Sequence, residues 1–394
     1  MSSSPIYLHP ADVQGLSRLA IDGVIGTAGL VEQLHYAIAR VSGPTLPARN
    51  GKMRGISGLV YRSIHGITGL VGSTTDRVFG QIVQRLAAPQ STPQRDRFLA
   101  LLNGVLGDQL EATGNPLAIA MELRDAGTAL VNDPPNLATR FPAAHPRIAI
   151  FIHGLCMSDH HWTPTADGHE RTDLPRLVHE AAGFQPLHVC YNSGRTIASN
   201  GLALAEQLEA LVRHWPVPVA ELALIGHSMG GLVARSALHH AELNGHSWPG
   251  HTGRLITLGS PHLGAPLERI GDKVDRALTL TPFSAPFARL GAIRSAGITD
   301  LRFGHLTQPG ERLLQPPHVR VHAVAATLAD DARALKSHTV GDGLVPVSSA
   351  LGRHRDPEQR LPTHRTAVVP QTGHLELMHH PSVAGHLRDW LTER

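Results

Sequence analysis

"IGHSMGG", residues 225–231, places a serine between two glycines in the pattern G-x-S-x-G. The apolar run 222–225 leads into this motif, and a segment with helical spacing, 229–241, follows it. A strand, a sharp turn and a helix in this order are typical of a nucleophile elbow, in which a strained backbone holds a serine hydroxyl above a sheet. The pattern therefore predicts that Ser228 is a nucleophile, and not simply a small residue in a glycine-rich turn.

The glycines of the turn and the helix after it favour the same interpretation. Gly226 and Gly230 stand where neighbouring backbones are expected to come too close for a Cβ atom. The N-terminus of the following helix offers free amides and a positive dipole to any negative charge that develops beside Ser228. The motif thus predicts a nucleophile with electrostatic support for its reaction.

A serine hydroxyl is a weak nucleophile, so it needs a base within hydrogen-bond reach and a third group that orients the base. In an elbow architecture the chain order is serine, acid, histidine. The predicted acid is Asp342, in the glycine-flanked turn of VGDGLVPVSSA, whereas Asp330 and Asp331 lie in the polar, helix-like stretch ADDARALK and are expected to be solvated. The predicted base is His374, which follows a glycine just after the last predicted strand, in VVPQTGHLELM.

The chain contains 27 histidines, so the choice of His374 depends on its position after a strand. Four other downstream histidines are expected to be surface or supporting residues: His338, His364, His379 and His380. An upstream group suggests a metal cluster at first sight: His153, His160, His161 and His169. The acidic partners and the fixed spacing of a hydrolytic metal site are missing there. We therefore predict neither a metal nor another cofactor.

A tetrahedral intermediate needs backbone N–H groups that bind its oxyanion. One predicted donor is the amide of Met229, the residue after the nucleophile. The second comes from the loop after the first core strand, FIHGLCMSDHHW, where Gly154 permits close approach to the substrate and the amide of Leu155 is the donor. Loss of one such donor typically costs about 3 to 4 kcal/mol of transition-state stabilisation.

Short β-branched runs alternate with helical stretches from residue 147 to the C-terminus. The predicted strands are 147–152, 187–191, 222–225, 254–258, 319–326 and 366–369. The predicted helices are 199–215, 229–241 and 383–392. Near-continuous apolar strands separated by helices favour a mostly parallel sheet covered on both faces, so the predicted fold class is α/β.

Residues 11–131 follow a different pattern, because their apolar residues recur at three- and four-residue intervals and no strand is predicted. GLSRLAIDGVIGTAGLV (15–31) aligns without gaps to GISGLVYRSIHGITGLV (55–71), which indicates a weak repeat of closely packed helices. Four prolines in 132–146 predict a linker. We therefore divide the chain into an N-terminal helical region with the linker, residues 1–140, and an α/β domain, residues 141–394.

Two interpretations of the helical region stay open. Its apolar face contacts a lipid surface, as a peripheral membrane protein would, or roofs the active site; alternatively it packs on the second domain, which we favour.

Residues 266–317 form an insertion longer than an ordinary connection. Such an insertion is expected to cap the site. The alternative is that it forms a surface segment with its own small core. Its apolar residues suit an acyl pocket: Leu278, Leu280, Phe283, Phe287, Leu290 and Ile293.

The composition is that of a soluble globular protein, with 42% hydrophobic and 17% charged residues. The formal net charge is +3 and no block of five like charges occurs, which argues against nucleic acid as a partner. We recognise no secretory signal peptide and no transmembrane helix, so a cytoplasmic location is expected. Cys156 and Cys190 lack metal-ligand spacing and are expected to be buried thiols. The sequence gives no basis for an oligomeric state.

Together these residues resemble the α/β-hydrolase superfamily, and within it the bacterial lipase and esterase branch, which also resembles the hydrolase domain of eukaryotic GPI inositol-deacylases. The motifs that carry the resemblance are HGL at 153–155, GHSMGGLVAR at 226–235, TLGSPHLGAP at 257–266, GDGLVP at 341–346 and GH at 373–374. The resemblance covers residue 141 to the C-terminus. It implies Ser228 as nucleophile, His374 as base, Asp342 as acid, and Leu155 and Met229 as oxyanion donors.

These motifs are specific for the fold and for Ser-His-Asp chemistry, and much less specific for substrate. Secreted lipases of this branch have signal peptides and often bind calcium, whereas this chain shows neither an export signal nor an acidic cluster near Asp342. The expected function is that of a serine carboxylic ester hydrolase, an esterase or lipase, acting through an acyl-enzyme on esters with hydrophobic acyl or alcohol groups. The alternatives are a thioesterase, an amidase, an acyltransferase, or a non-catalytic lipid-binding protein on a hydrolase scaffold.

Overall fold

The structure is a computed structural model, and it describes residues 91–164, 171–265, 295–308, 311–330 and 341–393, together with 11–12, 14–15, 17–19, 48–49 and 52–53. The chain divides into two compact units. One consists of Met1–Thr92 with Ala112–Leu117, and the other of Pro93–Glu111 with Ala118–Arg394. All the predicted site residues belong to the second unit.

The first unit is described only in small parts. Asn115 donates its side-chain amide to the carbonyl of Gly15 at 3.0 Å, and Arg18 donates to the carbonyl of Gly114 at 2.7 Å. The short strands β1 (Ala48–Arg49) and β2 (Lys52–Met53) pair antiparallel. Most of the predicted repeat lies outside the described residues, so its interpretation stays a prediction.

An eight-stranded sheet forms the centre of the second unit, in the order β10-β9-β8-β7-β5-β6-β3-β4. The strands are β3 (Glu122–Asp125), β4 (Thr128–Ala129), β5 (Arg147–Ile152), β6 (Gln185–Cys190), β7 (Glu221–His227), β8 (Thr252–Leu258), β9 (Arg320–Ala326) and β10 (Thr363–Val369). Strands β5 to β10 pair in parallel, whereas β3 pairs antiparallel with both β6 and β4. The predicted α/β class with a mostly parallel sheet is confirmed.

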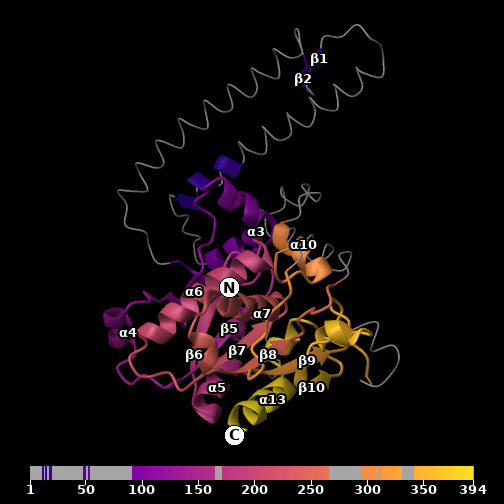
Figure 1. Cartoon of the computed structure of the whole chain (residues 1–394). Helices are drawn as coiled ribbons and strands as arrows, with labels where there is room; N and C mark the ends of the chain where they lie inside the picture. Colours follow the sequence, from indigo (N-terminus) through magenta and orange to yellow (C-terminus); the bar gives the residue numbers. More distant parts are fainter. Residues whose placement is uncertain are drawn as a thin grey trace, which may run out of the picture. The chain divides into compact units, whose positions relative to one another are not determined.

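Helices cover both faces of this sheet (Figure 1). The helices are α3 (Pro93–Ala112), α4 (Pro134–Arg140), α5 (Leu174–Ala182), α6 (Ile197–His214), α7 (Met229–Asn244), α10 (Ala296–Phe303), α12 (Val347–Ala350) and α13 (Pro381–Thr392). Four short 3-10 turns accompany them: η1 (Asp159–Trp162), η2 (Trp248–His251), η3 (Pro357–Gln359) and η4 (Glu376–Met378).

Strand β5 shows how the two faces are filled. Ile148, Ile150 and Ile152 belong to one core cluster, together with apolar side chains of α6 and α7. Ala149 and Phe151 belong to the other cluster, together with α5 and α13. Because successive side chains of a strand point to opposite faces, a strand that is covered on both sides is apolar throughout. This is the reason why β5 could be predicted with its observed bounds.

Three elements of the second unit contradict the expectations from the sequence. No strand was predicted before residue 131, but β3 and β4 extend the sheet there, and α4 lies inside the predicted linker. Strand β3 is only four residues long, and among them Leu123 alone is buried, so it shows no periodicity. Helix α4 begins with two prolines, which suit the first turn of a helix, and its N-cap Asp133 accepts from the amide of Asn136 at 2.9 Å.

The predicted cap is described only in part. Helix α10 falls within it, whereas all six apolar residues that were predicted to line an acyl pocket lie outside the described residues. The cap therefore stays a prediction. None of the helices in the described part of the chain combines the length and the apolar character that crossing a bilayer requires.

Candidate active site

Ser228 lies at the turn between β7, which ends at His227, and α7, which begins at Met229. Its backbone has φ of +53° and ψ of −123°, a conformation that side chains larger than glycine rarely adopt. The amide of Ser228 donates to the carbonyl of Leu258 at 2.9 Å, which ties the turn to the end of strand β8. The residue is 6% exposed. The strand, turn and helix expected around this serine are thus all present.

The two glycines of the motif allow close backbone contacts. A Cβ atom on Gly226 would lie 2.4 Å from the nitrogen of Gly231, and one on Gly230 would lie 2.2 Å from the carbonyl oxygen of Ile152. Neither neighbour is the mobile end of a side chain. The turn therefore packs against the end of β5 only because both positions lack a side chain.

Asp342 and His374 form a buried pair on two loops that follow β9 and β10. His374 Nδ1 lies 2.7 Å from Asp342 Oδ2, and the second carboxylate oxygen accepts from the amides of Leu344 and Val345 at 2.9 and 2.8 Å. Burial alone would raise the pKa of the Asp342 carboxyl, but His374 and the two amides outweigh it, so the pKa lies below its usual value. The carboxylate is therefore ionised at neutral pH.

The backbone of His374 is held at both ends. Its amide donates to the carbonyl of Asp342 at 3.2 Å, and its carbonyl lies 2.9 Å from Nε2 of His227. Because a carbonyl oxygen only accepts, the His227 ring carries its proton on Nε2. Burial and the nearby His374 ring lower the pKa of His227 to about 3, so this ring is neutral. Sequence reasoning assigned no role to His227, although it lies inside the G-x-S-x-G motif.

The serine and the Asp342–His374 pair approach the same strand end. Gly259 follows Leu258, whose carbonyl binds the amide of Ser228. A Cβ atom on Gly259 would lie 3.2 Å from Asp342 Oδ2 and 3.3 Å from His374 Cε1. The side chain of Ser228 makes no capping hydrogen bond to helix α7. Catalytic hydrogen bonds are often long in ligand-free enzymes and shorten when substrate binds.

The predicted oxyanion donors lie on two segments beside Ser228. Met229 is the first residue of α7, and Leu155 belongs to the loop after β5, where a Cβ atom on Gly154 would lie 3.0 Å from Ser228 Cβ. Neither amide donates to another described residue of the chain. Two free amides beside a serine are what an oxyanion would require.

His153 is the first residue of the loop after β5, and its contacts hold this loop in place. It is buried, and its ring stacks on Tyr191 with centroids 4.3 Å apart, while the Tyr191 hydroxyl donates to the His153 carbonyl at 2.8 Å. Burial lowers the pKa of His153 to about 4, so the ring is neutral. Tyr191 was not singled out from the sequence, because its partner lies 38 residues away and the contact follows from the parallel pairing of β5 and β6.

The other histidines occupy varied positions. His380 caps α13, with its Nδ1 accepting from the amide of Ser382 at 3.1 Å, and His364 is exposed at the edge strand β10. His379 is 9% exposed and lines a pocket together with His160 and His161. The remaining two candidates, His169 and His338, lie outside the described residues. Of the two cysteines, Cys190 is buried as expected, whereas Cys156 is partly exposed.

Asp96, Asp159 and His160 bring three ligand atoms within 4.8 Å of one another. A guanidinium already lies among them, since Arg124 Nη1 donates to Asp96 Oδ2 at 2.8 Å and to Asp159 Oδ1 at 3.0 Å. Burial alone would lower the pKa of Arg124, but the surrounding acidic groups outweigh it and raise the pKa. The cluster is therefore a largely buried ion-pair network of α3, β3 and η1, and its geometry does not favour a metal.

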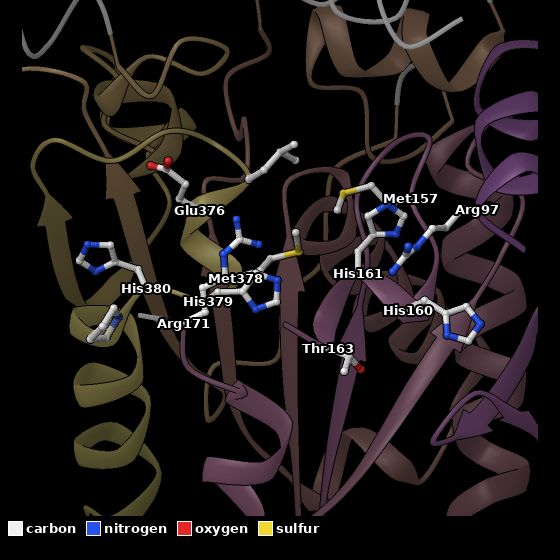
Figure 2. A pocket seen from close by; sticks show the side chains of 12 residues that line it. Arg97, Met157, His160, His161, Thr163, Arg171, Glu376, Met378, His379 and His380 are labelled. Carbon is white, nitrogen blue, oxygen red and sulfur yellow. The ribbon is translucent and has the colours of Figure 1, made fainter. Parts of the chain in front are cut away.

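A pocket of about 500 Å³ opens between the loop after β5 and the segment that follows His374 (Figure 2). Met157 lines the pocket, and its sulfur would lie 3.2 Å from a Cβ atom on Gly154, the same point that lies 3.0 Å from Ser228 Cβ. Leu375 and Met378 line the opposite wall. Met157 is therefore shared by the pocket and the surroundings of Ser228, whereas neither Ser228 nor His374 is among the residues that line the pocket.

Residues 145–281 match the family model described as PGAP1-like alpha/beta domain. No curated protein matches the chain. Among solved structures, the chain is similar to the lipase BlEst2 of Bacillus licheniformis, with 18% identity, a TM-score of 0.45, and coverage of 70% of this chain and 98% of that chain. It is also similar to the naproxen esterase of Bacillus subtilis, with 16% identity, a TM-score of 0.36, and coverage of 63% and 84% respectively. The RedJ thioesterase of Streptomyces coelicolor gives 19% identity, a TM-score of 0.36, and coverage of 64% and 92%.

Proposed function

We propose that the chain is an α/β hydrolase and, more closely, a serine hydrolase that cleaves carboxylic esters through an acyl-enzyme. The observation that carries the proposal is the 2.7 Å contact between His374 Nδ1 and Asp342 Oδ2. It leaves Nε2 of a buried, oriented imidazole as the base for an elbow serine.

In the first half of the reaction, Ser228 Oγ attacks the ester carbonyl carbon, and its proton passes to Nε2 of His374. The carbonyl oxygen becomes an oxyanion, which the amides of Leu155 and Met229 bind. The bond between the acyl carbon and the leaving oxygen then breaks, and His374 Nε2 donates its proton to that oxygen. The products of this half are a free alcohol and an ester of Ser228.

In the second half, a water molecule attacks the acyl carbon while Nε2 of His374 takes one of its protons. The bond to Ser228 Oγ breaks, the serine recovers its proton from His374, and the carboxylic acid leaves. Asp342 stays ionised throughout, because it accepts from Nδ1 and from two amides. It holds the ring in the tautomer that leaves Nε2 available and stabilises the imidazolium as it forms.

The apolar side chains that line the pocket of Figure 2 support substrates with a hydrophobic acyl or alcohol part. Met157 and Met378 are buried in the pocket wall, and Leu375 is 54% exposed at its mouth. A series of p-nitrophenyl esters from acetate to palmitate measures the preferred acyl length. Turnover of short soluble esters indicates an esterase, whereas turnover of emulsified long chains alone indicates a lipase.

The nucleophile is tested with a fluorophosphonate probe, which reacts covalently with activated serines. We expect the probe to label the wild-type chain and Ser382→Ala, because Ser382 is an exposed serine on α13, and to leave Ser228→Ala unlabelled. Equal labelling of wild type and Ser228→Ala, or labelling of neither, contradicts the proposal. Thioesters and amides offered to the same three proteins test the alternative acyl-transfer substrates.

A further inference from the structure

The loop after β5, which carries one of the predicted oxyanion donors, has a strained backbone. Cys156 directly follows Leu155 in this loop, and its φ of +60° lies in the left-handed region that side chains rarely adopt. Glycine would adopt this conformation at little cost. A residue with a side chain keeps it only where the surrounding structure holds it in place. The contacts of Cys156 therefore fix the shape of the loop beside Ser228.

Ser193 binds the backbone of this loop. Its Oγ accepts from the amide of Cys156 at 3.0 Å, and Ser193 is 1% exposed. Ser193 lies in the loop after β6, and β5 and β6 are neighbouring parallel strands, so the loops that follow them meet at the same edge of the sheet. The hydrogen bond joins these two loops and fixes the peptide between Leu155 and Cys156.

Helix α3 packs directly on Cys156. A Cβ atom on Gly104 of α3 would lie 2.2 Å from Cys156 Sγ and 2.9 Å from both its backbone nitrogen and its Cα. So close an approach is possible only because Gly104 has no side chain. The helix therefore leaves Cys156 no space in which to relax toward it.

The same helix holds the loop of Ser193. Asn192 donates its side-chain amide to the carbonyl of Gly107 at 2.8 Å, and its Oδ1 accepts from the amide of Gly194 at 3.0 Å. A Cβ atom on Gly194 would lie 2.7 Å from the nitrogen of Gly107. Both partners of the hydrogen bond between Ser193 and Cys156 thus belong to loops that contact α3.

The peptide before Leu155 is held as well. The Tyr191 hydroxyl donates to the carbonyl of His153 at 2.8 Å, and Nδ1 of His153 lies 2.9 Å from the carbonyl oxygen of Gly154. Because a carbonyl oxygen only accepts, this ring nitrogen carries a proton. The carbonyl of Gly154 and the N–H of Leu155 belong to one peptide. Leu155 therefore lies between two peptides that are each held by a side chain.

We propose that Ser193 is a positioning residue of the oxyanion hole. With the support of α3, it holds the amide of Cys156 and thereby keeps the N–H of Leu155 directed at the substrate oxyanion. The proposal rests on the proposed ester hydrolysis and adds to it a role for α3, which precedes the sheet in the sequence. Loss of the Ser193 hydroxyl should leave binding of the ester unchanged and weaken binding of the oxyanion.

Kinetics with p-nitrophenyl hexanoate measure the first effect. We expect kcat of Ser193→Ala to be about tenfold below that of the wild type, with KM unchanged within about twofold. Ser193→Thr keeps the hydroxyl and should recover part of kcat. Ser236→Ala is the matched control, because Ser236 is equally buried but donates to the carbonyl of Leu306 at 2.6 Å, in a contact between α7 and the segment after α10. It should keep the wild-type kcat.

Two ketones with the hexanoyl chain measure the second effect. On a trifluoromethyl ketone, Ser228 Oγ adds to the carbonyl carbon, the serine proton passes to His374, and the ketone oxygen becomes an oxyanion. The corresponding methyl ketone binds without forming this adduct. In Ser193→Ala the Ki of the trifluoromethyl ketone should rise about tenfold, whereas that of the methyl ketone stays unchanged. An unchanged Ki for the trifluoromethyl ketone overturns the proposal, and so does an equal loss of kcat in Ser236→Ala.

A substitution on α3 tests the same loop and keeps the proposal testable if Ser193→Ala does not fold. Gly104→Ala should displace Cys156 and reproduce the pattern of lower kcat, unchanged KM and weaker binding of the trifluoromethyl ketone. Gly385→Ala is its control, because Gly385 also lies in a helix, α13, and a Cβ atom there would meet no heavy atom of the described residues within 4 Å. Wild-type kinetics in Gly104→Ala contradict the role of α3.

Hydrogen exchange separates failure of this proposal from failure of the proposed function, because it does not depend on catalysis. The amide of Cys156 should exchange about tenfold faster in Ser193→Ala than in the wild type or in Ser236→Ala. Faster exchange in a chain that hydrolyses no ester means that the proposed function alone fails. Ester hydrolysis that requires Ser228, together with an unchanged kcat in Ser193→Ala, refutes the positioning role alone.

Discussion

At the scale of single residues, His227 shows how a motif position outside the proposed triad supports it. Its Nε2–H donates to the carbonyl of His374 at 2.9 Å, and the two ring centroids lie 4.8 Å apart. The residue that precedes the serine therefore holds the backbone of the residue that is proposed to deprotonate it. Among the described residues, the other ring nitrogen, Nδ1, has no partner.

Replacing His227 with phenylalanine should lower both stability and activity. The buried carbonyl of His374 loses its donor, which typically costs about 1 to 3 kcal/mol of unfolding free energy. We expect kcat to fall more than KM rises, and His227→Gln, which offers a side-chain N–H, to recover part of kcat. Urea unfolding and ester kinetics measure the two effects.

His322→Phe is the matched control. His322 is also buried, but among the described residues neither of its ring nitrogens has a hydrogen-bond partner, and its ring stacks on Trp390 at 4.9 Å. Phenylalanine retains this stacking, so near neutral pH the control should keep its stability and kcat. The positioning role of His227 is wrong if both variants lose kcat equally, or if neither does.

At the scale of elements, the sequence predicted three of the helices and the buried parallel strands. It did not predict β3 and β4, the antiparallel strands at one edge of the sheet. The strands β5 to β10 and the helices α6, α7 and α13 each overlap a predicted element. The strands are apolar throughout because helices cover both faces of the sheet. The helices are apolar on the one face that packs against the sheet. Strand β3 lacks such periodicity because its side chains include the nearly buried Arg124, whose charge is compensated by Asp96 of α3, Asp159 of η1 and Glu122 of β3 itself.

The Arg124 network should contribute more to stability than a surface ion pair. Arg124 is 12% exposed and contacts Asp96, Asp159 and Glu122 on three different elements. Removing one partner from a buried ion pair typically costs about 3 to 5 kcal/mol, because the remaining charges stay desolvated. We expect Arg124→Met to lose about this much unfolding free energy in chemical denaturation.

Arg140→Met provides the comparison for this substitution. Arg140 pairs with Asp125 at 2.5 Å, but it is 46% exposed, so its loss should cost no more than about 1 kcal/mol. Similar losses in the two variants would mean that burial of the Arg124 network adds nothing. A large loss for Arg124→Met alone supports the network as the connection between α3, β3 and η1.

At the scale of the whole molecule, several buried histidines bind protons poorly. Burial lowers the pKa of His153, His161 and His322 to about 4 and that of His227 to about 3, from the ordinary value of 6.5. The unfolded chain therefore binds more protons than the folded chain between these values. The stability that these neutral histidines contribute is fully present above pH 6.5. It is lost as the pH falls from 6.5 toward about 4.

The free energy of unfolding should decrease from about pH 7 to about pH 5, by up to about 1.36 kcal/mol per pH unit for each such histidine. His322→Phe removes one of these groups, so its slope should be shallower than that of the wild type. Urea unfolding at a series of pH values measures both slopes. Identical slopes would show that His322 titrates normally in the folded chain.

The sequence by itself determined the features that depend on neighbours along the chain. The glycines around Ser228, the apolar strands and the turns that hold Asp342 and His374 all have short-range physical causes, namely steric limits of the backbone and periodic burial. The predicted roles of these residues are proposals that the probe experiment tests. The chain order of serine, acid and histidine limited the choice among 27 histidines.

Only the tertiary structure decided which distant groups meet. His227 and His374 are 147 residues apart, and Arg124 contacts acidic residues 28 and 35 positions away. No local pattern encodes such contacts, because they depend on strand order and on the packing of helices across the sheet. The pocket of Figure 2 has the same origin, since Arg97 and His379 come from segments that lie close together only when the chain is folded.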